Sequence, residues 1–142
     1  MALSEREVAF LEANRSAAMI TVGADGLAKA ARVAVGLLDG RLWSSGTADR
    51  VRTRRLRQNP RCTLYVHADT FSFMTMETTV TILEGPDAAE QSVRLFRKLQ
   101  DRPTGPLGWM TGELEEDTFR QAMVDEQRLI YEFEVTRSYG LY

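Results

Sequence analysis

Apolar and polar residues along the chain alternate with a period of two in some segments and with the period of a helix in others. Two-residue alternation begins near Ala17 and, after the turn Ala24-Asp25-Gly26, resumes over residues 27–38. Asp39-Gly40 is a strong hairpin signal, because a type I′ turn needs positive φ at both central positions. Residues 41–45 are therefore predicted to return as the next strand.

Further strands are predicted in the second half of the chain. Alternation marks residues 61–67 and 129–135, while β-branched and aromatic residues dominate residues 71–84. Strands joined by short turns cannot be parallel, because a parallel crossover needs a dozen or more residues. The pattern predicts a mainly β (α+β) fold in which six antiparallel strands close as a small barrel with flanking helices.

Two helices are predicted in the first half of the chain. Ser4 and Glu7 form a capping box, which predicts a short helix through about Arg15. Thr47 is expected to cap a second helix, which ends shortly before Pro60.

Two amphipathic helices are expected later, at residues 88–100 and 115–126. The segment 101–112 between them is rich in glycine and proline and is expected to be a loop. Trp109 in this segment is either an aromatic side chain of a lid or an anchor of the loop.

Composition narrows the class of protein. The 142 residues are 44% apolar and 27% charged, which fits a single globular domain over residues 1–142. No apolar run is long enough to cross a membrane and no secretory signal is evident, so a cytoplasmic location is expected. With one cysteine, Cys62, and one histidine, His67, no disulfide and no metal site are expected. Cys62 lies on the apolar side of its strand and is predicted to be buried.

Six arginines crowd residues 50–61, although the net charge of the chain is only −2. Ser44-Ser45-Gly46-Thr47 precedes them, where a strand is expected to give way to a helix. Hydroxyls and free amides at a helix start can cradle an anion, and arginines can clamp phosphate oxygens. A solvated charged helix face is the alternative for any single arginine. A nucleic-acid surface is disfavoured, because no aromatic side chain interrupts residues 50–61 for stacking on bases.

The strand after the first turn is a second candidate binding site. Ala30, Arg32, Ala34 and Gly36 share one face, so one charge stands among very small neighbours. Such a face leaves room for a flat group against the backbone. The alternative is an edge strand with Arg32 in water.

Several motifs along the chain together resemble a known family. The motifs are Ala24-Asp25-Gly26, Arg32-Val33, residues 44–47, residues 50–61 with Asn59-Pro60-Arg61 after the helix, Phe119–Met123 with Arg128, and Ser138-Tyr139-Gly140. From about Phe10 to Gly140, the chain resembles the pyridoxamine 5′-phosphate oxidase-like split β-barrel, also called the FMN-binding split barrel. More narrowly, it is similar to the flavin/deazaflavin oxidoreductases of actinobacteria that use coenzyme F420.

The resemblance implies a homodimer with two cofactor sites at the subunit interface. It places Ser45, Arg50 and Arg52 where the cofactor phosphate is held, and Lys29, Arg32 and Val33 on the strand under the ring system. The full set of expected cofactor-binding residues is Lys29, Arg32, Val33, Ser44, Ser45, Thr47, Arg50, Val51 and Arg52. The family usually has lysine where Arg52 stands, and many relatives have Glu-Gly where this chain has Glu77-Thr78. Arginine keeps the positive charge and adds a planar fork of donors.

The expected function is that of an F420-dependent oxidoreductase, which transfers a hydride to an unsaturated organic substrate. The cofactor would supply the chemistry, and the protein would supply the orientation and the electrostatics. This division of roles fits a chain with few acid–base residues. Two alternatives remain open: an FMN-dependent oxidoreductase of the pyridoxamine-phosphate-oxidase type, and a non-catalytic F420 carrier. No catalytic residue is indicated, and neither nucleic acid nor membrane is an expected partner.

Overall fold

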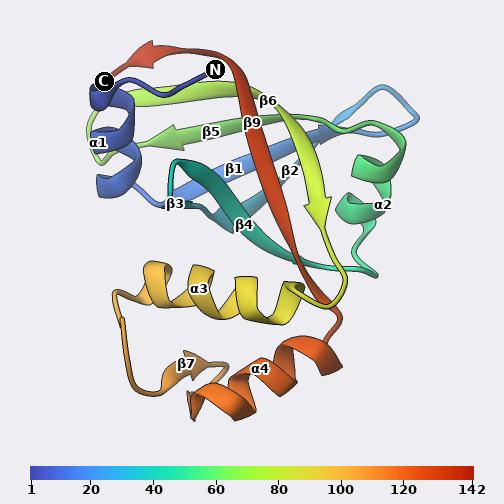
Figure 1. Cartoon of the computed structure of the whole chain (residues 1–142). Coiled ribbons are helices and arrows are strands. Elements are labelled where there is room, and N and C mark those ends of the chain that lie inside the picture. Colours follow the sequence, from blue (N-terminus) through green and yellow to red (C-terminus); the bar gives the residue numbers. More distant parts are fainter.

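The computed structural model describes all 142 residues, and its centre is a curled antiparallel sheet (Figure 1). The strands of this sheet are β1 (Ser16–Val22), β2 (Ala28–Ala34), β3 (Gly36–Leu38), β4 (Arg41–Thr47), β5 (Arg61–His67), β6 (Phe73–Leu83) and β9 (Arg128–Leu141). Their order across the sheet is β2-β1-β5-β6-β9-β4-β3. The predicted mainly β, antiparallel architecture with flanking helices is confirmed, although the sheet has seven strands instead of six.

The seventh strand arises because the stretch predicted as one strand changes partner at Val35. Residues up to Ala34 pair with β1, whereas Gly36 pairs with Trp43 of β4. The Ser44 hydroxyl on β4 donates to the Ala34 carbonyl oxygen at 2.7 Å, which links β2 to β4. One nearly continuous stretch therefore forms both edges of the sheet and draws them together.

The main core fills the inside of the curled sheet. Alternation places Ala17 and Met19 of β1, and Leu64 and Val66 of β5, on this inner side. Cys62 also lies there, with 4% of its surface exposed, so its predicted burial is confirmed. Asp39 and Gly40 both have positive φ, 52° and 77°, as the predicted hairpin turn requires.

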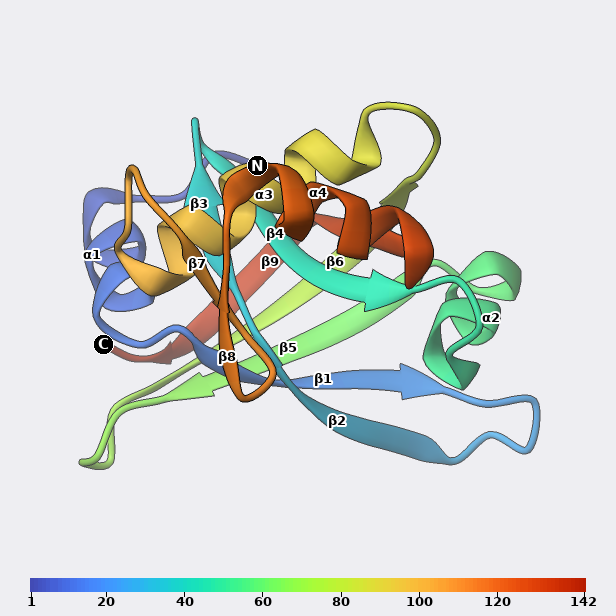
Figure 2. The same cartoon turned by 90° about the horizontal axis from the view of Figure 1, so that it is seen from below.

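Two short helices lie at opposite ends of the sheet. Helix α1 (Glu5–Ala13) opens with the predicted capping box between Ser4 and Glu7. Helix α2 (Val51–Gln58) lies between the end of β4 and the β1–β2 hairpin (Figure 2). The predicted start of α2 at Thr47 is wrong: its N-cap is Arg50, without a side-chain cap.

The reason for the late start is the pairing of β4 with β9. Thr47 pairs with Arg128, and the Ala48 amide donates to the Gln127 carbonyl oxygen at 3.0 Å. The ladder therefore extends past Thr47, and helical hydrogen bonds begin only when the Arg54 amide donates to the Arg50 carbonyl oxygen.

A second layer covers the outside of β3, β4 and β9 (Figure 1). It consists of α3 (Ala88–Gln100), the hairpin β7 (Leu107–Trp109) and β8 (Gly112–Leu114), and α4 (Glu116–Asp125). The hairpin corrects part of the prediction of a loop over residues 101–112: β7 and β8 pair with each other, and the side chain of Gln100 at the end of α3 bonds to Gly108. None of the helices has the length and apolar character that crossing a membrane requires.

Candidate anion-binding site

The arginines of α2 divide between two faces, as helical spacing predicts. Arg50, Arg54 and Arg57 are exposed, whereas Arg52 and Arg55 are half-buried. Two of the five have protein partners: Arg57 forms an ion pair with Glu84 at 2.7 Å. Arg55 Nε donates to Thr21 Oγ1 at 2.9 Å. These two side chains connect α2 to the sheet.

Arg52 is different, because its buried Nε has no hydrogen-bond partner. No carboxylate lies within ion-pair distance of its guanidinium, whose carbon is 5.8 Å from the centre of the Tyr131 ring. Burial lowers the pKa of Arg52; the neighbouring Tyr131 opposes this shift, and the positive charges of Arg50 and Arg128 add to it. A buried donor without an acceptor costs about 1–3 kcal/mol. The Nε–H of Arg52 is thus a donor for which the chain supplies no acceptor.

The Tyr131 side chain lies beside Arg52, and the absence of a side chain at Gly46 leaves space for the Tyr131 ring. A Cβ atom at Gly46 would lie 2.3 Å from the Tyr131 hydroxyl, so only glycine fits there. Thr53 Oγ1 is hydrogen-bonded to the Tyr131 hydroxyl and donates to the Thr47 carbonyl oxygen at 2.7 Å. This buried network fixes the start of α2 against β4 and β9.

The serines before α2 have different environments. Ser44 is buried and its hydroxyl is already bonded to Ala34, so it contributes to the closing of the sheet. Ser45 lies on the opposite face of β4, and its buried hydroxyl oxygen has no partner. Ser45 and Arg52 are the two side chains with buried polar atoms left unpaired.

Thr47, Arg50 and Val51 line one surface depression of about 600 Å³. Its opposite wall comes from the turn between α4 and β9 and includes Asp125 and Glu126. The Thr47 hydroxyl donates to Asp49 at 2.7 Å, and this bond lowers the pKa of Asp49. Carboxylates therefore share this depression with Arg50.

The predicted residues of β2 do not converge on one point. Lys29 forms an ion pair with Asp25 at 3.0 Å and lies near α2: a Cβ at Gly23 would be 3.3 Å from Lys29 Cε and 3.9 Å from Arg55 Cδ. Val33 is buried in the core. Arg32 lies on the outer face, where its Nε donates to Ser16 Oγ at 3.0 Å.

Arg32 borders a second depression, of about 590 Å³, which also involves Tyr65 and His67. Ladder register aligns Arg32 with Ala18, Tyr65, Thr75 and Tyr139 in one row across the outer face. The structure thus places the predicted residues in two regions, one around α2 and one on the outer face of the sheet.

Sequence reasoning missed Tyr131 and Arg128. Tyr131 occupies a buried position in the alternation of β9, where a hydroxyl requires a partner, and this was the available signal. Arg128 is the first residue of that strand; it belongs to the motifs of the resemblance, but nothing in its local sequence marked it as a binding residue. No three His, Cys, Asp or Glu side chains come together in a way that would hold a metal ion.

The fold and the α2 region define a class of protein: an antiparallel split β-barrel with a cluster of arginines, one of them with an unpaired buried Nε, where β4 meets α2. The family model described as pyridoxamine 5′-phosphate oxidase matches residues 3–141. The chain therefore belongs to this family, as the motifs predicted. No curated protein sequence matches it significantly.

Solved structures with low sequence identity share the fold. A conserved hypothetical protein of Mycobacterium tuberculosis is 21% identical, with a TM-score of 0.74 over 98% of this chain and 84% of that one. An F420 reductase is 21% identical, with a TM-score of 0.69 over 96% of this chain and 98% of the other. A heme storage protein of Vibrio cholerae is 11% identical, with a TM-score of 0.67 over 99% and 95%. At these identities the likeness concerns the fold alone.

Proposed function

We propose that the protein is an F420-dependent oxidoreductase that transfers a hydride to an unsaturated organic substrate. One observation carries the proposal: the buried, unpaired Nε of Arg52, beside other cations and in the fold of the pyridoxamine 5′-phosphate oxidase family. A phosphate oxygen is the acceptor that this geometry lacks. Charge-assisted bonds between arginine and phosphate are strong and directional.

The residues present fit such a cofactor. Arg50 and Arg52 would hold the phosphate, with Thr47 and Val51 beside Arg50 in one depression and Ser45 nearby in β4. Bound there, the cofactor would supply hydride transfer. The chain itself would orient the cofactor and exclude water from the reacting face.

The charge around α2 favours a deazaflavin over FMN. FMN carries one phosphate, whereas F420 adds a phosphodiester and a polyglutamate tail. Arg54 and Arg61 are exposed and form no ion pair with a carboxylate, so they remain free for further anionic groups. The F420 reductase among the structural neighbours supports the same choice.

The second region, around Arg32, fits a cofactor site that is completed by a partner subunit. The outer face of the sheet combines small residues of β1 and β2 with exposed aromatic side chains, including Tyr65 (36% exposed) and Tyr139 (46% exposed). We infer that this face pairs with a second copy of the chain. Arg32 would then lie at the interface, where the ring system would rest against β2.

A binding titration tests the proposal directly. Purified protein is titrated separately with F420 and with FMN, and affinity is followed by cofactor fluorescence. Tighter binding of F420 is expected, and preferred binding of FMN, with a yellow protein as isolated, would support the FMN-dependent alternative instead. Turnover is then assayed with reduced F420 and a panel of conjugated enones and quinones. Tight F420 binding without turnover on the panel would indicate a carrier.

A further inference from the structure

Arg128 lies beside the anion-binding site but comes from a distant part of the chain. It is the first residue of β9 and pairs with Thr47, the last residue of β4. The next backbone bond, between Ala48 and Gln127, keeps the two segments together at 3.0 Å. The α4–β9 turn and the β4–α2 connection are therefore adjacent, and the charge of Arg128 acts on Arg52.

The guanidinium of Arg128 is held on two sides. Its Nε and Nη2 both donate to Glu126 Oε1, at 3.1 and 3.0 Å. The guanidinium carbon Cζ of Arg128 lies 4.8 Å from the centre of the Trp109 ring, a cation–π distance. The other oxygen of Glu126 accepts from the Trp109 indole at 2.8 Å. Nη1 and one hydrogen of Nη2 are left without a protein acceptor, so the free edge of the fork can bind an anion.

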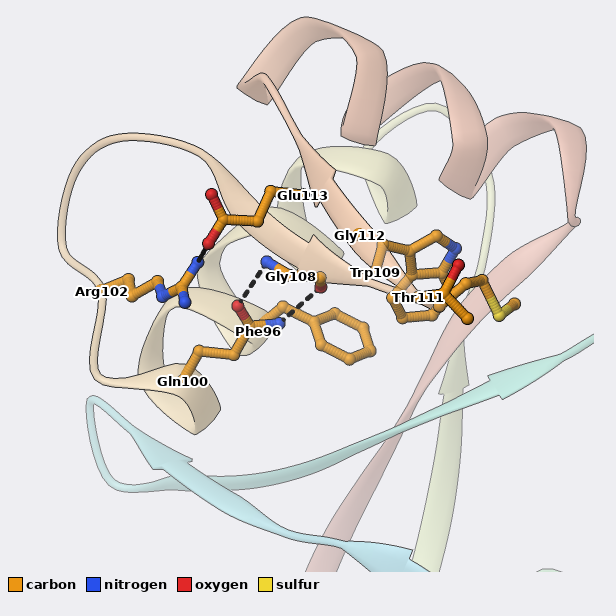
Figure 3. A pocket seen from close by; sticks show the side chains of 9 residues that line it. Phe96, Gln100, Arg102, Gly108, Trp109, Thr111, Gly112 and Glu113 are labelled. Carbon is orange, nitrogen blue, oxygen red and sulfur yellow. Dashed lines mark hydrogen bonds and ion pairs between the residues drawn. The ribbon is translucent and has the colours of Figure 1, made fainter.

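Trp109 is itself fixed in place by the second layer. Its ring packs edge-on against the rings of Phe96 and Phe119, with ring centres 5.1 Å and 5.5 Å apart. The amide of Gln100 makes two bonds of 2.8 Å with the backbone of the neighbouring Gly108, as Figure 3 shows. Trp109 is thus an anchor with one face available to Arg128, which decides between the two roles that the sequence left open.

We propose that Arg128 is a third cationic ligand of the anion-binding site, and that Trp109 and Glu126 are positioning residues that orient its guanidinium. The ligand group is a phosphate ester or diphosphate, bound jointly by Arg52 and Arg128. This inference rests on the proposed function only for the identity of the cofactor, because the anion site can be probed by itself. It also gives the second layer a role in binding.

The first experiment uses the unmodified protein and inorganic pyrophosphate. Nitrogen-15 NMR follows the Nε–H signals of arginine side chains, assigned with single variants, during the titration. The signals of Arg52 and Arg128 are expected to shift together with one dissociation constant. A shift of Arg52 with no shift of Arg128 would overturn the inference.

Variants then separate binding from positioning. Arg128→Ala is expected to weaken pyrophosphate binding tenfold or more, and Arg128→Lys to recover part of the loss. Arg94→Ala is the matched control, because Arg94 also pairs with a carboxylate (Asp39, 2.8 Å) and lies over an indole (Trp43, 5.7 Å), but at the other end of β4. Equal effects of Arg128→Ala and Arg94→Ala would show a general charge effect and overturn the inference.

Trp109→Phe tests the positioning role. Phenylalanine keeps a ring against Phe96 and Phe119 but removes the indole donor to Glu126. The pyrophosphate response of Arg128 should shrink while that of Arg52 persists; an unchanged Arg128 response would refute the positioning role.

Failure of this inference is distinguishable from failure of the proposed function. If pyrophosphate shifts Arg52 and Arg128 but neither F420 nor FMN binds, the anion site stands and the proposed cofactor does not. If F420 binds, with a loss in Arg52→Ala and none in Arg128→Ala, the proposed function stands and the third ligand does not.

Discussion

Arg52 is the residue on which the proposed anion-binding site chiefly depends. Six arginines occur between residues 50 and 61, and among them the family resemblance singles out Arg50 and Arg52. In the structure, Arg57 and Arg55 have protein partners, whereas Arg52 has a buried donor without one. Since an unpaired buried donor is costly, this environment supports the proposed role of Arg52 in anion binding.

Arg52→Ala is expected to weaken cofactor binding by about one to two orders of magnitude. A hydrogen bond to a charged partner contributes roughly 1.5–3 kcal/mol, and each 1.4 kcal/mol is about tenfold in affinity. Arg57→Ala, which removes the same charge from a side chain bound to Glu84, should change affinity much less. Fluorescence titrations at several salt concentrations measure both, and affinity should fall as salt screens the exposed contacts. Equal losses in both variants would indicate only a diffuse positive field.

Cys62 is expected to be unreactive in the folded protein. Burial raises the pKa of its thiol to about 11, so almost no thiolate forms near neutral pH. Because the pKa is raised above its ordinary value of 9.0, the thiol's contribution to stability is intact below pH 9.0 and declines as pH rises towards 11. Alkylation by iodoacetamide at pH 7.5 should therefore be slow without denaturant and fast in ~6 M urea, where the thiol is exposed.

Cys62→Ala should leave cofactor affinity unchanged and lower the free energy of unfolding by about 1 kcal/mol, as for the loss of a small core side chain. Urea unfolding and a cofactor titration of the same variant measure the two quantities. A folded variant with lost affinity would show that Cys62 has a functional role.

At the scale of elements, α1 and the end of β9 are joined through one carboxylate. Glu7 closes the capping box by accepting from the Ser4 amide at 2.8 Å. Its other oxygen accepts from the hydroxyls of Ser138 and Tyr142. Burial alone would raise the pKa of Glu7, but these hydrogen bonds outweigh it, so the pKa lies below 4.5. The helix is thereby fastened to a strand more than 130 residues away.

Glu7→Gln tests this link through pH. A lowered pKa means that the carboxylate stabilises the fold fully above pH 4.5 and that this contribution is lost as pH falls through the folded-state pKa. The wild type should therefore be more stable at pH 7, by about 2 kcal/mol, the scale of a charge-assisted hydrogen bond. The difference should shrink towards pH 3. Urea unfolding at both pH values measures it, with exposed Glu5→Gln as the control; a pH-independent difference would contradict the role of the charge.

At the scale of the whole molecule, the outer face of the sheet is the surface expected to pair. Tyr65 and Phe73 lie on it with their rings 5.7 Å apart, near the exposed Tyr139 and Leu141. Phe71, in the turn between β5 and β6, is 93% exposed. Clustered apolar groups of this kind mark interaction surfaces.

Tyr65→Glu is expected to convert a homodimer into monomers, because it places a charge in the middle of the apolar face. Val124→Glu, at an exposed position of α4 in the other layer, should leave the oligomeric state unchanged. Sedimentation velocity at micromolar concentration distinguishes the two. A wild-type protein that sediments only as a monomer would refute the proposed dimer and the shared cofactor site.

Local chemistry made much of the fold predictable from the sequence. The Ser4–Glu7 capping box and the Asp39-Gly40 turn depend on residues within a few positions of each other. The burial of Cys62 follows from its phase in a single strand. The family, too, was identified from short motifs along the chain, among them residues 44–47 and 50–61.

Only the tertiary structure decided which residues far apart in the chain contact each other. The start of α2 depends on the pairing between Ala48 and Gln127. The pairing of β4 with β9 also brings Arg128 to the end of β4, from where its charge acts on Arg52. A residue's partners are set by backbone register and packing across the sheet, which local periodicity does not specify.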